Sequence, residues 1–268
     1  MPFDPSQPTA LLFAAVAVVG LVGGLVGGLA GLGGSIIMLP GLALVLGFSG
    51  EEHAEQHLYM AASMVANVAV AVPATLRHKR AGVIPGRLAV RLLPSVLLSV
   101  AVGVYLSNRL DGVVLTRLLG GMVLVFVVLV FVRERLSPEA DGKDTNTAGL
   151  DVSGVATGLS AGLLGVGGGV VLVTALRALA RLPIRTAIGL SSTVMIATAS
   201  LGATLKMMSL GSLGLSAGEG LRIAAALAPG ATVGAMVGSS LVHRLPTARV
   251  RLIVSLIMVL AAVKLLSA

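Results

Sequence analysis

Long runs of apolar residues, separated by short polar stretches, dominate the chain. Each run is apolar throughout and does not alternate with polar positions, so the pattern favours membrane-spanning helices over the strands of a barrel. Roughly 18 or more apolar residues suffice for a helix to cross a bilayer. The pattern therefore predicts an all-α polytopic membrane protein, with helical segments at 10–48, 58–76, 88–107, 113–132, 150–176, 186–205, 221–242 and 248–266.

The chain matches itself when it is shifted by about 134 residues, which indicates an internal repeat. With one residue of drift, Arg87 and Pro94 also fall on Arg222 and Pro229. The matching glycines are Gly20, Gly24, Gly28, Gly31, Gly33 and Gly34, which fall on Gly154, Gly158, Gly162, Gly165, Gly167 and Gly168.

A polar, turn-rich stretch, RERLSPEADGKDTNTAG, separates the two related halves. We therefore assign 1–134 to a first membrane repeat, 135–149 to a polar linker and 150–268 to a second membrane repeat. Each half begins with a long glycine-rich segment and continues with three ordinary helical segments.

The first apolar segment is too long for one membrane span. Pro5–Gly50 holds 46 uncharged residues, a helix of about 69 Å against a hydrocarbon core of about 30 Å. The segment must fold back, and the turn is expected at Gly31–Ser35, because glycine adopts backbone angles that other residues avoid. The repeat places the corresponding turn at Gly165–Gly169.

The distribution of basic residues supports this hairpin in both halves. If each glycine segment is one span, the two sides of the membrane hold 11 and 8 of the Lys and Arg residues. If each is a hairpin, the counts become 14 and 5, with Lys206 among the five in outer loops. The positive-inside rule favours the second arrangement. It inverts one half relative to the other, a common plan of secondary transporters.

Composition narrows the functional classes. The mean hydropathy is +1.02 and only 11% of residues are charged, as in integral membrane proteins. The net charge of +8 resides mostly at the ends of apolar runs, where it serves orientation and lipid headgroups, so no nucleic acid partner is expected. There is no cysteine, no metal-ligand spacing, no catalytic motif and no cofactor fingerprint, so we expect neither an enzyme nor a bound metal or cofactor.

The glycine turns are candidate anion sites. Broken helices expose backbone N–H groups, and the following half-helix presents its positive N-terminus. No Asp or Glu lies inside an apolar run, which argues for an anionic cargo rather than a cation. Close helix packing alone also explains part of the glycine pattern. The candidate binding residues are Gly31, Gly33, Gly34, Ser35, Asn67, Gly165, Gly167, Gly168, Gly169, Ser191, Ser192 and Thr193.

Three further residues are weaker candidates. His57 lies near the edge of its apolar run, where it is either a proton relay or a solvated loop residue. Arg87 and Arg222 occupy matched positions and either gather anions at two entrances or extend to lipid headgroups. Ser and Thr side chains in such helices often bond only to their own backbone.

The sequence resembles the sulfite exporter TauE/SafE-like family of bacterial permeases. The resemblance rests on GLAGLGGSIIMLPGL at 28–42, GLLGVGGGVVLVTAL at 162–176 and TAIGLSST at 186–193. It implies transport of sulfite or another small sulfur-containing anion across the bacterial inner membrane, and suggests a homodimer. We therefore predict an alternating-access transporter of a small anion in the lipid bilayer. The alternatives are a passive anion channel and a non-transporting membrane assembly partner.

Overall fold

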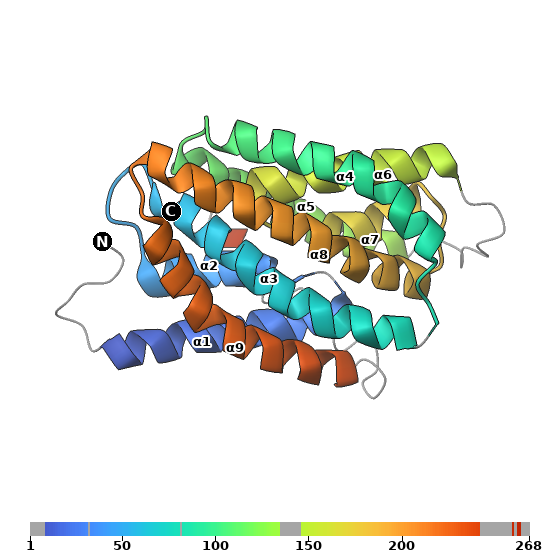
Figure 1. The fold of residues 1–268 in the computed structure, drawn as a ribbon, viewed down its shortest axis with the longest axis horizontal. Coiled ribbons are helices and arrows are strands. Elements are labelled where there is room, and N and C mark those ends of the chain that lie inside the picture. Colours follow the sequence, from blue (N-terminus) through green and yellow to red (C-terminus); the bar gives the residue numbers. More distant parts are fainter. Residues whose placement is uncertain are drawn as a thin grey trace.

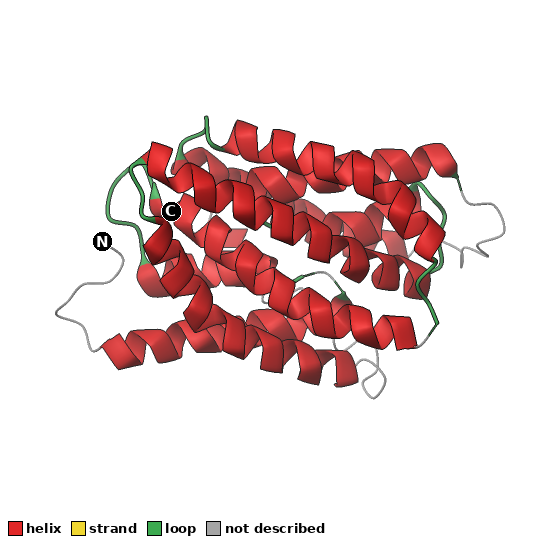
Figure 2. Ribbon diagram, viewed as in Figure 1, coloured by secondary structure: helices red, strands yellow, loops and turns green. Residues whose placement is uncertain are grey.

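The computed structural model describes residues 9–31, 33–80, 82–134 and 146–241, together with Val259, Ala262 and Val263. Across this part of the chain the regular elements are helices (Figures 1 and 2). They are α1 (Thr9–Ala30), α2 (Ser35–Leu46), α3 (Glu55–Arg80), α4 (Gly86–Ser107), α5 (Gly112–Glu134), α6 (Thr147–Leu164), α7 (Gly169–Ala178), α8 (Ile184–Ser209), the 3-10 turn η1 (Leu210–Leu213) and α9 (Ala217–Leu241).

The first glycine segment is a helical hairpin, as its length predicts. It breaks between α1 and α2 at residues 31–34. Gly23 of α1 packs against Met38 of α2, and further from the break Val19 packs against Gly41. Because these contacts pair positions at growing distances from the turn, α2 runs back along α1.

The second glycine segment folds in the same way. It breaks between α6 and α7 at residues 165–168. Gly168 packs against Thr157, and near the open end of the hairpin Gly149 packs against Leu179. The predicted fold-back is therefore observed in both segments.

Two long helices, α3 and α8, cross the centre of the molecule in opposite directions. His57 at the start of α3 lies beside Lys206 near the end of α8, while His78 at the end of α3 lies near Gly189 at the start of α8. The two hairpins enter from opposite ends of the bundle (Figure 1). The relation of the two halves as inverted repeats stays a prediction.

The glycine stripes pack helices from different halves against each other. Gly24 of α1 faces the backbone oxygen of Ala231 in α9, where an added Cβ would lie only 2.1 Å away. Gly158 of α6 likewise faces the backbone oxygen of Val96 in α4, at 2.3 Å from an added Cβ. Small residues let helix backbones approach this closely. Each hairpin thus packs closely against a helix of the other half of the chain.

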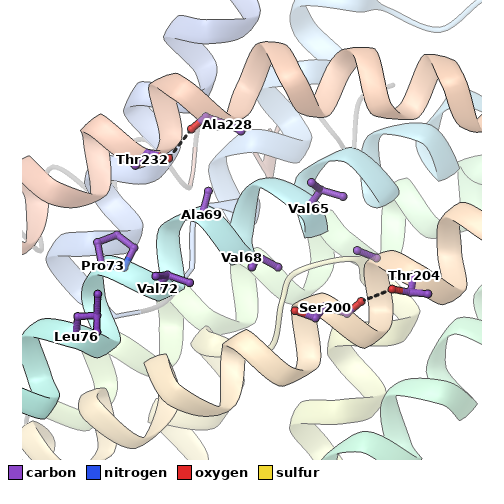
Figure 3. Close-up of a pocket in the computed structure, with 11 residues that line it drawn as sticks. Val65, Val68, Ala69, Val72, Pro73, Leu76, Ser200, Thr204, Ala228 and Thr232 are labelled. Carbon is purple, nitrogen blue, oxygen red and sulfur yellow. Dashed lines mark hydrogen bonds between the residues drawn. The ribbon is translucent and has the colours of Figure 1, made fainter.

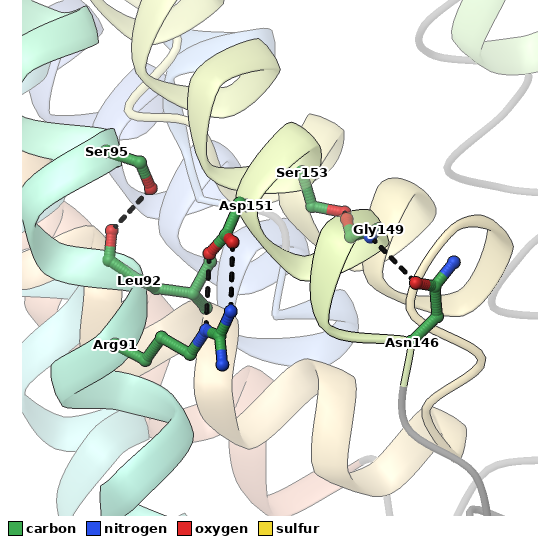
Figure 4. Close-up of polar contacts among 7 residues, drawn as sticks. All are labelled: Arg91, Leu92, Ser95, Asn146, Gly149, Asp151 and Ser153. Atoms are coloured by element: carbon green, nitrogen blue, oxygen red, sulfur yellow. Dashed lines mark hydrogen bonds and ion pairs between the residues drawn. The ribbon is translucent and has the colours of Figure 1, made fainter.

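An exposed ion pair lies at the same α4–α6 interface (Figure 4). Arg91 Nη2 lies 3.0 Å from Asp151 Oδ2. Both side chains are about half exposed, so the pair contributes little beside the glycine packing.

The helix ends extend past the predicted apolar segments, because polar residues continue most of the helices. α6 begins at Thr147, inside the predicted linker, where the Asn146 side chain accepts a hydrogen bond from Gly149 N at 3.2 Å. Among the described helices, α1, α3, α4, α8 and α9 are long and apolar enough to cross a membrane. Most of the linker and most of the segment predicted at 248–266, apart from Val259, Ala262 and Val263, lie outside the described residues.

Candidate functional site

The turns of the two hairpins meet in the interior of the bundle. Gly33 of the first turn lies against the backbone of Val166 in the second. Ser191 of α8 joins both turns, because its hydroxyl lies within hydrogen-bond distance of the carbonyl oxygens of Gly31 (3.4 Å) and Gly169 (3.1 Å). Residues more than a hundred positions apart thus form one polar site, here called the turn site.

Asn67 of α3 holds the first turn at the start of α2. Its Oδ1 accepts hydrogen bonds from Gly34 N at 2.8 Å and from Ser35 N at 3.2 Å. Its Nδ2 donates to Ser35 Oγ, and that hydroxyl also lies 3.4 Å from the carbonyl oxygen of Ser63. The buried amide therefore satisfies two N–H groups that the helix start leaves without a partner in the helix.

The second turn packs on the same amide from the other side. Gly167 has φ +69°, and a Cβ there would lie 2.3 Å from Asn67 Nδ2. Thr198 of α8 donates to the carbonyl oxygen of Gly167 at 2.9 Å. Gly165 packs against Met60 of α3, much as Gly31 packs against Ile188 of α8. These positions have no space for a side chain.

The turn site lies deep in the protein, near the midpoints of α3 and α8. Asn67 and Ser191 are fully buried, as is Ser35. Buried apolar residues such as Val166 and Met195 surround them. Hydrogen bonds in such a water-poor setting are stronger than at a surface, and so is the attraction between helix N-termini and a negative charge.

The starts of the two half-helices differ. The N–H groups of Gly34 and Ser35 at the start of α2 already donate to an amide oxygen. At the start of α7, the N-cap residue Gly168 has no side chain that could accept from the first N–H groups. In the second half, Met195 packs on Gly33 much as Asn67 packs on Gly167. Among the described residues, only the first half therefore supplies an amide to the turns.

The predicted site residues divide into two groups. The structure brings ten of them together at the turns, namely Gly31, Gly33, Gly34, Ser35, Asn67, Gly165, Gly167, Gly168, Gly169 and Ser191. Ser192 and Thr193 are different, since each donates to its own helix, at Ile188 O and Gly189 O. Thr198 belongs to the turn site but is not among the predicted residues. Its contact with Gly167 depends on the packing of α8 and has no signal in the sequence.

A second buried polar cluster lies at one end of the bundle. Lys206, expected in an outer loop, is instead fully buried in α8. Its Nζ lies 2.7 Å from each of His57 Nδ1, Ser107 Oγ and Asn108 Oδ1. His57 is also buried, at 4% exposure, so it is not a solvated loop residue. The mostly apolar surroundings of Lys206 in the sequence give no hint of these partners.

Arg87 and Arg222 are exposed near the starts of α4 and α9. These helix starts follow the ends of α3 and α8, which run in opposite directions, so the two arginines lie at opposite ends of the bundle. Neither residue touches the turn site, and their predicted role at two entrances stays a prediction.

A groove of about 740 Å³ opens between α3, α8 and α9 (Figure 3). Its lining is mostly apolar and includes Val65 and Val72. The hydroxyls of Thr204 and Thr232 donate to carbonyl oxygens of their own helices. The groove is therefore mostly apolar, with Ser200 as a further hydroxyl in its lining, and differs in chemistry from the turn site.

Comparisons with known proteins point to one family. Residues 16–265 match the family described as sulfite exporter TauE/SafE. Two curated relatives, each named probable membrane transporter protein MamO, are 26% identical in Magnetospirillum gryphiswaldense and 25% identical in Paramagnetospirillum magneticum. Each alignment covers 88% of this chain but only 42% and 41% of those proteins, so the chain spans about two fifths of their length. No solved structure matches.

Proposed function

Because the chain belongs to the sulfite exporter TauE/SafE family of membrane transporters, and is therefore no enzyme, we propose that it carries a small anion across the bacterial inner membrane. The proposed cargo is sulfite or another small sulfur-containing anion, and the proposed mechanism is alternating access. The family match agrees with the resemblance seen in the sequence.

The meeting of the two glycine turns is the observation that carries this proposal. Both half-helices that follow the turns direct their N-termini at one buried region. Helix N-termini stabilise negative charge, and a non-helical backbone inside a membrane protein is tolerated where it lines a site. A small anion is the ligand that this arrangement suits best.

The hydrogen bonds of Asn67 suggest how the anion binds. Asn67 Oδ1 holds the N–H groups of Gly34 and Ser35 where an anion oxygen would be held. In our proposal the anion replaces this amide oxygen, and the freed side chain rotates to donate to the anion from Nδ2. Ser191 and Thr198 keep the turns in place because they bond to turn carbonyls rather than to the cargo.

Alternating access is supported by the opposite directions of the hairpins. One hairpin opens toward each end of the bundle, so motion of one hairpin at a time would expose the turn site to one side. The tight α1–α9 and α4–α6 contacts suggest that each hairpin moves together with its partner helix.

Flux measurements with purified protein in liposomes test the proposal. We expect exchange of radiolabelled sulfite that unlabelled sulfite inhibits and that is absent from empty liposomes, with a sulfonate and sulfate as rival cargoes. Accumulation against a gradient would exclude a passive channel. Absence of flux for all three anions would contradict transport of sulfur anions and favour a membrane assembly partner.

A further inference from the structure

The buried cluster around Lys206 has no role in the turn site, yet it is unusual for a membrane interior. Lys206 is fully buried, and the partners of its Nζ are a neutral hydroxyl, a neutral amide and an imidazole. Within the described part of the chain, no carboxylate lies within ion-pair distance of it. A buried ammonium without a counter-ion is costly, and loss of its proton removes that cost.

The geometry of the cluster accommodates both protonation states. An ammonium has three N–H donors, and Nζ has three partners at 2.7 Å. His57 Nδ1 accepts such a bond when the imidazole is neutral with its proton on Nε2. When Lys206 is the neutral amine, its nitrogen lone pair accepts from Ser107, whose hydroxyl then gives up its hydrogen bond to Val104 O (2.9 Å).

Other ionisable groups on the surrounding elements do not neutralise Lys206. No described contact joins any of them to its Nζ, and Glu55 accepts instead from Ser49 N at 3.1 Å. These groups are His53 in the loop before α3, Glu55 and Tyr59 on α3, Arg109 and Asp111 after α4, and Glu219 and Arg222 on α9.

Lys206 is also joined to the turn site through one helix. It lies eight residues after Thr198 on α8, or about 12 Å along the helix, and Thr198 bonds to the second turn. For a monovalent anion held about 12 Å from Nζ, at an effective dielectric constant of about 20, a positive charge strengthens binding by about tenfold. The charge of Lys206 and an anion at the turns therefore favour each other.

We infer that Lys206, assisted by His57, Ser107 and Asn108, is the proton-binding site that couples a proton to each transported anion. The inference rests on the proposed function. A proton from water binds the neutral Nζ to give the ammonium. On release Nζ passes that proton to Nδ1 of neutral His57, and the imidazolium so formed loses its Nε2 proton to water on the side where the anion leaves. One proton carried with one monovalent anion moves no net charge.

Two substitutions of Lys206 distinguish the effect of its positive charge from the effect of its proton exchange. Lys206→Arg keeps a positive charge that proteins do not deprotonate, and Lys206→Met removes it. The assay is exchange of radiolabelled sulfite in liposomes at acidic and alkaline pH. The ionisation of sulfite itself changes between these pH values, but it changes equally for every variant. A difference between variants therefore reports a property of the protein. Lys79→Met is the matched control, since Lys79 is exposed at the other end of α3.

In the wild-type protein and in Lys79→Met, we expect the half-saturating sulfite concentration to rise from acidic to alkaline pH. The rise should be about tenfold larger than in either Lys206 variant. Lys206→Arg should keep tight binding at both pH values, and Lys206→Met weak binding at both. His57→Gln, which leaves the charge in place, should slow proton-driven uptake more than exchange. Size-exclusion chromatography of His57→Gln and of each Lys206 variant shows whether the variant is folded.

The outcomes separate the two claims. If Lys206→Arg follows the pH dependence of the wild-type protein, the proton site is overturned although sulfite transport stands. If the wild-type protein exchanges no sulfite, the proposed function fails first, and the coupling inference fails with it. Loss of pH dependence in both Lys206 variants with retained exchange supports the inference.

Discussion

At the scale of single residues, Asn67 joins the two turns through one buried amide. Asn67→Asp keeps the shape but places a carboxylate oxygen on the N–H groups of Gly34 and Ser35. Charge-assisted hydrogen bonds are stronger by about 1–2 kcal/mol, so the carboxylate should compete with the anion and lower sulfite exchange by about tenfold or more. Exchange in liposomes measures this. Unchanged exchange would show that the cargo does not use these N–H groups.

Adjacent serines on α8 provide a matched comparison of stability. Ser191→Ala removes the hydroxyl that bonds to Gly31 and Gly169 and leaves buried carbonyl oxygens, at a cost of about 1–3 kcal/mol. Ser192→Ala removes a hydroxyl that bonds only within its helix, with an effect within about 0.5 kcal/mol. Thermal unfolding of the two variants measures the difference. Equal melting temperatures would contradict the bridging role of Ser191.

At the scale of elements, the glycine stripe of α1 fixes its distance from α9. Gly24→Ala would place a Cβ 2.1 Å from Ala231 O, a backbone atom that cannot move alone. We expect a loss of about 1–3 kcal/mol in the free energy of unfolding. Gly121→Ala in α5 is the control, since its Cβ would meet open space and alanine favours the helix by up to about 1 kcal/mol. If both variants melt alike, the close α1–α9 contact is not required for stability.

The elements show where sequence reasoning succeeds and where it ends. The two hairpins follow from segment length and from the charge count, and Asn67 follows from the need of a buried amide for partners. The sequence could not distinguish Ser191 and Thr198 from Ser192 and Thr193, because only tertiary packing decides which hydroxyl meets another segment. Lys206 was misplaced for a related reason, since hydropathy treats a lysine as a boundary, while the Nζ of this one bonds to His57 of α3 and to Ser107 and Asn108 at the end of α4.

At the scale of the whole molecule, the structure places loops at two ends of the bundle. A chain without native cysteine permits single reporters at Glu52 and Ser212 at one end, and at Lys79 and Arg181 at the other. We expect an impermeant maleimide added to intact cells to label cysteines at the first two positions at least tenfold faster than at the other two, a difference of about 1.4 kcal/mol or more in labelling barrier. Lysis should remove the difference. Labelling of Arg181→Cys from outside would contradict the hairpin of α6 and α7.

The pairing of α1 with α9 also has a consequence for how the protein is made. α1 is synthesised first and already carries its glycine stripe. Its partner α9 emerges from the ribosome only after most of the remaining chain has been synthesised. Until then α1 lies among lipids, which cost an apolar helix little. Neither half buries its own glycine stripe, so a gene divided within the linker should yield two pieces that are each degraded alone and stable only when produced together.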